Sequence, residues 1–236
     1  MIGPIGYSPV VTDERARLID THVPRRPQGV VLVLHGGAAR GQRMPVSAAQ
    51  LSVLRMVPVA ARIARAAPGL VVQRLLNSSR GWDSRVTPVD DVRWALAEAA
   101  ERFGDSLPVC LVGHSLGGRA ALLAGGQPAV RSVVALAPWL YPTDGEVDLG
   151  GRDVLVVHGD QDRIARPDIA EGVARRLARR ARVGHITVVG GKHAMLRHHS
   201  AFDGLAADFA AATLLGTPAG GLVGRMLAGE QWLRTS

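Results

Sequence analysis

Short apolar runs alternate along the chain with longer stretches whose apolar residues recur at helical spacing. The apolar runs lie at residues 30–34, 70–76, 109–112, 133–136, 154–157 and 186–189, and residues 16–23 are expected to add an edge strand. The helical stretches lie at residues 51–67, 89–103, 116–124, 168–181 and 202–215. Most runs are apolar at every position, which is typical of strands covered on both faces. The pattern predicts a doubly wound, mostly parallel α/β sheet with helices on both faces, and the ligand site of such a sheet lies outside the carboxyl ends of its strands.

The length of 236 residues and the hydrophobic content of 47% suit one α/β domain with a full core. No repeat, low-complexity tract or linker divides the chain, so a single domain over residues 1–236 is predicted. A glycine-rich stretch breaks the last long helix near residue 216. Beyond it we expect a short helix within residues 222–233 that packs back on the body.

The formal charge is +8, but the basic residues are spread over four of the five predicted helices instead of being clustered. No nucleic-acid partner is therefore expected. One cysteine allows no intramolecular disulfide, and no leader-like segment is seen near the N-terminus, which favours a cytoplasmic protein. The apolar runs are far shorter than the roughly 20 residues that span a bilayer. No metal-ligand spacing or nucleotide-binding loop is present, so neither a metal nor a cofactor is expected.

A reactive serine is predicted at residue 115. The sequence Gly-His-Ser-Leu-Gly at residues 113–117 directly follows the run 109–112 and opens the helical stretch 116–124. A glycine-x-serine-x-glycine sequence at such a turn holds the serine in a strained conformation above the sheet. The first amides of the following helix also suit an oxygen that will carry negative charge.

A serine hydroxyl needs a base within hydrogen-bond reach and a carboxylate behind that base. The run 154–157 ends in His-Gly-Asp-Gln-Asp at residues 158–162, and the run 186–189 ends in Gly-Gly-Lys-His at residues 190–193. Both segments follow carboxyl ends of strands and so share an edge of the sheet with Ser115. His193 is the candidate base. Asp160 and Asp162 are both candidate acids, although Asp160 comes directly off the strand, where an aspartate commonly caps a turn.

The other polar candidates have simpler explanations. His185 precedes its predicted strand and is expected at the opposite edge of the sheet. His35, His114 and His158 flank the site loops, where a histidine can hold a loop by hydrogen bonds. His198 and His199 are expected on the surface. Cys110 lies in the middle of a core strand and is interpreted as a small buried hydrophobe.

The segments Leu-His-Gly-Gly at 34–37, Gly-His-Ser-Leu-Gly-Gly at 113–118, His-Gly-Asp-Gln-Asp at 158–162 and Gly-Lys-His-Ala at 191–194 resemble the signature blocks of the α/β-hydrolase superfamily. The resemblance to this superfamily spans residues 30–195. The resemblance is to its short-lid, dienelactone-hydrolase-like esterase branch. It implies a serine hydrolase in which Ser115 is the nucleophile, His193 the base and Asp162, the second aspartate of its block, the acid. It also implies an oxyanion hole made by the amide of Leu116 and an amide just after His35-Gly36, either Gly37 or Ala38, of which Gly37 is preferred.

The segment 137–152 is too short for a large lid, so an open site is expected. Trp82 and Trp139 each follow a strand's carboxyl end and are candidates for the walls of a substrate pocket. The loop 38–43, with Arg80 and Arg119, is expected to make the site entrance basic and to favour a substrate with a carboxylate or phosphate.

Two other functions are open. The chain could be a non-catalytic ligand-binding protein on the hydrolase scaffold, since fold does not fix function. It could also be a cofactor-free perhydrolase or haloperoxidase that uses the same three residues. The intact serine, histidine and aspartate favour a hydrolase acting on a small acyl substrate, an ester or a thioester.

Overall fold

The computed structural model describes residues 15–37, 46–82 and 87–235. The strands are β1 (Arg17–His22), β2 (Gly29–Leu34), β3 (Leu70–Leu76), β4 (Val109–His114), β5 (Val130–Leu136), β6 (Asp153–Gly159), β7 (Arg182–Val188) and β8 (Trp232–Arg234). The helices are α1 (Leu51–Leu54), α2 (Met56–Ala66), α3 (Thr87–Phe103), α4 (Leu116–Ala124), α5 (Pro167–Leu177), α6 (His199–Leu215) and α7 (Gly221–Leu227), with a short 3₁₀ helix η1 (Pro142–Glu146).

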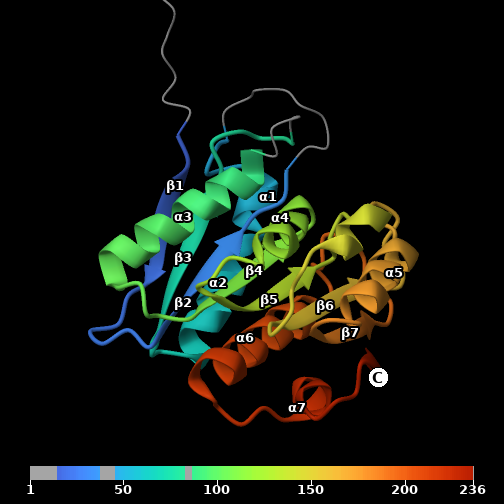
Figure 1. Cartoon of the computed structure of the whole chain (residues 1–236). Coiled ribbons are helices and arrows are strands. Elements are labelled where there is room, and N and C mark those ends of the chain that lie inside the picture. The colour runs from blue at the N-terminus through green and yellow to red at the C-terminus, as the bar shows by residue number, and fades with distance from the viewer. Residues whose placement is uncertain (1–14, 38–45, 83–86, 236) are drawn as a thin grey trace, which may run out of the picture.

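One sheet runs through the described part of the chain, with its eight strands in the order β1-β3-β2-β4-β5-β6-β7-β8. Only β1 runs antiparallel to its neighbour β3; the other pairs are parallel. Helices α3, α4 and α5 cover one face, and α2 and α6 cover the other (Figure 1). The predicted doubly wound, mostly parallel sheet is therefore confirmed.

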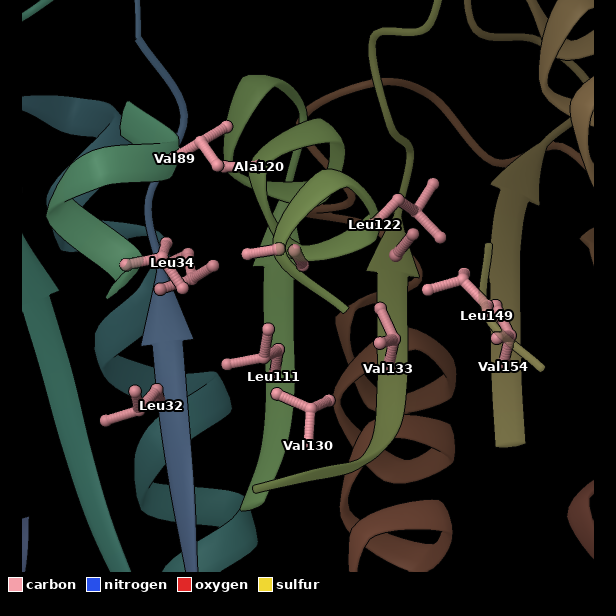
Figure 2. Close-up of a cluster of buried hydrophobic side chains, with 14 of the residues drawn as sticks. Leu32, Leu34, Val89, Leu111, Ala120, Leu122, Val130, Val133, Leu149 and Val154 are labelled. Carbon is pink, nitrogen blue, oxygen red and sulfur yellow. The ribbon is translucent and has the colours of Figure 1, made fainter. Parts of the chain in front are cut away.

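The inner strands are apolar at most positions because their residues alternate between two cores. In β2, Val30 and Leu32 face the helices α3 and α4, whereas Val31 and Val33 face α2 and α6. Figure 2 shows the first of these cores, with side chains of β2, β4, β5 and β6 gathered under α4. Helices pack on both faces, which is why no strand of this group shows the polar–apolar alternation of a half-exposed strand.

Two predicted helices differ most from the observed ones. The stretch 51–67 is divided into α1 and α2, and Pro58 explains the break because it has no amide proton to donate to the carbonyl of Leu54. The tail does pack back on the body, as expected, but only residues 221–227 are helical. Residues 232–234 instead form β8, which pairs in parallel with β7 at the sheet edge.

The topology brings four neighbouring strand ends together. Strands β4, β5, β6 and β7 are adjacent and parallel, so the loops that follow them lie at one edge of the sheet. The segment between β5 and β6 contains only the helix η1, which agrees with the expectation of a minimal lid. The loops after β4, β6 and β7 carry Ser115, Asp162 and His193.

Neither a membrane-spanning helix nor a metal-binding cluster is found in the residues that the structure describes. None of their helices is both long and apolar enough to cross a bilayer. No three of their His, Cys, Asp or Glu side chains are grouped so that they could hold a metal ion.

Candidate active site

Ser115 lies at a sharp turn between β4 and α4. Its backbone has φ 56° and ψ −121°, a conformation that side-chain-bearing residues rarely adopt. The turn is tight: a Cβ added at Gly113 would overlap the carbonyl of Gly117, and one added at Gly117 would overlap the carbonyl of His35. The two glycines of the motif are therefore required by close backbone approach, and together they hold the serine above the strand end.

A continuous hydrogen-bond relay joins the three predicted residues. The Nε2 atom of His193 lies 3.0 Å from the Oγ of Ser115, and its Nδ1 lies 2.8 Å from Oδ2 of Asp162. An ionised carboxylate can only accept, so Nδ1 carries the proton and Nε2 is free to accept a proton from the serine. The structure thus brings Ser115, His193 and Asp162 within hydrogen-bond distance of one another, in that order.

Four donors surround the Asp162 carboxylate. Besides His193, His158 Nε2 lies 3.1 Å from Oδ2, and the amides of Ile164 and Ala165 donate to Oδ1 at 2.8 Å and 3.0 Å. Burial by itself would raise the pKa of Asp162, but the hydrogen bonds from His158 and His193 outweigh it and hold the pKa well below its usual range. The group is therefore a fixed anion at neutral pH.

Asp160 has a different environment. Its Oδ1 accepts a hydrogen bond of 2.8 Å from the amide of Gly190, and its Oδ2 lies 3.3 Å from Nη2 of Arg234. Both contacts tie the loop after β6 to the segment after β7 and to β8. The geometry thus gives Asp160 a role in holding the loop and leaves Asp162 as the aspartate that contacts His193.

The segment after β2 lies directly beside the serine. A Cβ added at Gly36 would be 3.2 Å from the Cβ of Ser115, and one added at Gly37 would reach Leu116 Cδ1 at 4.0 Å. His35 fixes this segment, because its Nδ1 donates to the carbonyl of Gly36 at 2.6 Å and its Nε2 accepts from the amide of Asn77 at 3.2 Å. Leu116 is the first residue of α4, so its amide has no carbonyl within the helix to bond. Ala38, the other candidate, lies outside the described residues.

Three further histidines, His35, His114 and His185, are buried, and burial lowers the pKa of each. His114 Nε2 donates to the carbonyl of His193 at 2.9 Å, and burial lowers the pKa of His114 to about 3. His185 lies in the middle of β7, not before its strand as predicted, and burial lowers its pKa to about 4. Burial likewise lowers the pKa of His35. Burial raises the pKa of the Cys110 thiol to about 12, so it is an inert core residue.

The two tryptophans have packing roles near the serine. Trp82 is 9% exposed, and the guanidinium of Arg119 lies over its ring at 4.4 Å. The Trp139 amide donates to the carbonyl of Ser115 at 3.1 Å, and its side chain packs on the core. Two pockets border His193, and neither tryptophan lines them.

Of the basic residues expected at the entrance, Arg80 and Arg119 belong to the described part of the chain. Arg119 makes a two-pronged ion pair with the buried Asp144, at 2.8 Å and 3.0 Å, so its charge is neutralised. The loop 38–43 lies outside the described residues, and Arg80 is exposed.

Sequence reasoning missed one residue that contacts the base loop. Arg55, between α1 and α2, donates from Nε to the carbonyl of Ala194 at 3.0 Å and from Nη2 to Asp203 Oδ1 at 2.8 Å. Both Arg55 and Asp203 are buried. Nothing in the local sequence signals this contact, because Asp203 lies 148 residues away and the arginine stands on an ordinary amphipathic stretch.

Comparison with known proteins identifies the fold. No protein-family model and no curated protein matches the sequence. Among solved structures, Est1E from Butyrivibrio proteoclasticus with bound ferulic acid matches with a TM-score of 0.64 and 15% identity, over 85% of this chain and 96% of that chain. An esterase from Pyrobaculum calidifontis matches with a TM-score of 0.64 and 17% identity, over 85% and 80%.

A serine hydrolase homologue from Coxiella burnetii matches with a TM-score of 0.62 and 17% identity, over 81% of this chain and 90% of that chain. At identities this low, the likeness shows the shared fold. The fold that the sequence resemblance predicted is thereby confirmed, whereas the dienelactone-hydrolase-like branch stays a prediction.

Proposed function

This chain has the α/β-hydrolase fold, and we propose that it is a serine hydrolase that cleaves a carboxylic ester or thioester through an acyl-enzyme intermediate. The observation that carries the proposal is the unbroken relay from Ser115 Oγ through His193 to Asp162. A ligand-binding protein on the same scaffold would have no need to keep all three groups within hydrogen-bond distance.

In the first half-reaction the Ser115 oxygen attacks the acyl carbon while its proton passes to Nε2 of His193. The tetrahedral intermediate then collapses, the bond to the leaving alcohol or thiol breaks, and the same proton moves from Nε2 to the leaving atom. In the second half-reaction a water molecule gives a proton to Nε2 and attacks the acyl carbon, and Ser115 leaves with that proton. Atoms and charge balance with water as the only further reactant.

The negative charge of the tetrahedral intermediate requires donors that are already in place. The amide of Leu116, at the start of α4, is one such donor, and it is supported by the positive end of that helix. The amide of Gly37 is the second, since this residue lies beside Leu116 at the end of the segment that His35 holds. Removing one donor of this kind typically lowers turnover by about 10² to 10³.

The anionic Asp162 stabilises the imidazolium that forms in each half-reaction and keeps the Nδ1 proton in place. His158 and the amides of residues 164 and 165 fix the carboxylate so that one oxygen faces His193. The aspartate stays ionised throughout, consistent with its lowered pKa.

Covalent labelling tests the proposal directly. A fluorophosphonate should react with the native protein at Ser115, since the Ser115 oxygen displaces fluoride from phosphorus only when a base takes its proton. Peptide mass spectrometry should find the adduct on the peptide that contains residue 115. The Ser115→Ala variant and the denatured protein are the controls. A folded native protein that stays unlabelled would remove the basis for a serine hydrolase and favour the ligand-binding alternative.

The oxyanion segment gives a second prediction. Alanine at position 37 keeps the amide, but its methyl group would overlap the Arg80 carbonyl, so the segment must shift. We expect Gly37→Ala to lower kcat for p-nitrophenyl acetate by about 10²-fold. Gly172→Ala on α5 is the matched control, because an added Cβ there meets nothing within 4 Å. It should leave kcat unchanged and stabilise the protein by about 0.5 to 1 kcal/mol in chemical denaturation. Parental kcat for Gly37→Ala would contradict the prediction that the position of this segment controls turnover.

A further inference from the structure

A pocket of about 500 Å³ opens beside His193, on the side where α1 and α2 meet the loop after β7. Its lining includes Leu51, Leu54, Pro58, Ala194 and Leu196, together with the rings of His114 and His193. The size falls within the range of small-molecule sites in proteins. Because His193 forms part of its wall, whatever occupies the pocket lies against the proposed base.

The pocket is mostly apolar, and the one arginine in its lining is paired. Arg55 lines it, but the buried Asp203 lies 2.8 Å from its guanidinium and neutralises it. His114 is neutral because burial lowers its pKa to about 3. Most of the remaining lining is aliphatic, together with the polar Ser52 and His199, and Leu51 and Leu196 remain 84% and 68% exposed. A carboxylate or phosphate would lose its hydration here without gaining an unpaired arginine or lysine, so the occupant is an uncharged apolar group.

The side on which the pocket lies decides which part of a substrate enters it. The leaving oxygen must be within hydrogen-bond reach of His193 Nε2 to receive its proton, whereas the carbonyl oxygen must face the amides of Gly37 and Leu116. The alcohol part of an ester therefore extends from the reacting carbon toward His193 and its surroundings. This is the side on which the pocket opens.

We propose that this pocket binds the alcohol part of the substrate, so that the preferred substrates are esters of uncharged, apolar alcohols. The inference rests on the proposed serine hydrolase activity and specifies its substrate class. It differs from the prediction that Trp82 and Trp139 form the walls of the substrate pocket, because both lie away from this lining.

Two isomeric ester series test the proposal. Ethyl, butyl and hexyl acetate lengthen the alcohol, whereas ethyl acetate, ethyl butyrate and ethyl hexanoate lengthen the acyl group, so hexyl acetate and ethyl hexanoate have the same composition. Each methylene that is fully buried should raise kcat/KM about fourfold, and four of them up to about 200-fold. We expect hexyl acetate to exceed ethyl hexanoate at least about tenfold. Equal values, or the reverse order, would overturn the proposal.

Aspartate substitutions inside and outside the pocket wall provide a second test. Leu196→Asp and Leu54→Asp place a charge on residues that are 68% and 46% exposed, so the fold should tolerate them. Both should reduce the ratio of kcat/KM between hexyl and ethyl acetate to near one. Val23→Asp, at a residue 41% exposed just after β1, should keep the parental ratio. A parental ratio in both pocket variants would overturn the proposal.

Hydrolysis of p-nitrophenyl acetate separates the failure of this inference from failure of the activity itself. If that hydrolysis depends on Ser115 while the acetate series shows no preference for the longer alcohol, only the pocket assignment fails. If no hydrolysis depends on Ser115, the proposed function fails as well. Sedimentation velocity tests whether a second copy of this chain occupies the pocket instead. A dimer that dissociates in Leu196→Asp while the hexyl-to-ethyl ratio is unchanged would make the apolar wall an interface between two copies and overturn the proposal.

Discussion

Replacing Ser115 by alanine should lower kcat for p-nitrophenyl acetate by about 10⁵- to 10⁶-fold, with the free energy of unfolding within about 1 kcal/mol of the parent. The change removes the oxygen that attacks the acyl carbon and keeps the Cβ, so packing is almost unaffected. The only side-chain hydrogen bond lost within the described residues is the one to His193. Steady-state kinetics and chemical denaturation on the same preparation measure both quantities.

Ser132→Ala is the matched control. Ser132 is also buried, but it lies inside β5 and its hydroxyl pairs with the Thr213 hydroxyl at 2.8 Å. Its loss should destabilise the protein by about 1 kcal/mol and leave kcat/KM unchanged. The two variants thus separate activity from stability. Residual activity of Ser115→Ala within tenfold of the parent, with an unchanged circular dichroism spectrum, would exclude Ser115 as the nucleophile.

The Asp162→Asn variant should lower kcat by about 10⁴-fold. The asparagine can still accept the amides of Ile164 and Ala165 through its carbonyl oxygen, so the loop should keep its shape. Its NH₂ group then faces His193 in place of the carboxylate oxygen. Two donors cannot face each other, so Nδ1 becomes the acceptor and Nε2 carries the proton. A protonated Nε2 cannot take the proton of Ser115, and the negative charge that stabilises the imidazolium is also gone.

Asp160→Asn provides the comparison within the same loop. Asp160 bonds the Gly190 amide, which an asparagine oxygen can also accept, and its partner Arg234 is exposed. We expect kcat to fall by less than about tenfold, with a stability loss of at most about 1 kcal/mol. Both variants are measured on one ester, with denaturation curves beside the kinetics. If Asp160→Asn costs more activity than Asp162→Asn, the acid role belongs to Asp160; parental rates for both would place the acid outside this loop.

The sequence predicts the central strands and the order of the layers well, because both follow from local hydrophobic pattern. Strand β2 is apolar at all positions since it is buried on both faces, and periodicity records this. Strand β8 carries no such signal. It has three residues, of which Trp232 is partly exposed, and it becomes a strand only because β7 offers an open edge for pairing.

The residues of the candidate site likewise include some that a local motif predicts and others that depend on contacts between distant segments. Ser115, Asp162 and His193 each belong to a short motif that follows a strand, so the topology of a parallel sheet suffices to bring them together. The pocket beside His193 could not be predicted, because it joins residues 51–58 to residues 193–199. Which helix covers which loop depends on packing between distant segments, and no local pattern reports that packing.

At Ser115, the backbone conformation that the proposed reaction needs lowers the stability of the fold. With φ at 56°, the residue occupies a region that costs of order 1 to 3 kcal/mol for a side chain with a Cβ. Glycine would relax the turn, but glycine has no oxygen to react. The residue that would best stabilise this part of the protein is thus the one that cannot perform the proposed chemistry. The strain is sustained by the buried strands on either side, and thermal adaptation of this fold would have to act through those strands and leave the serine turn as it is.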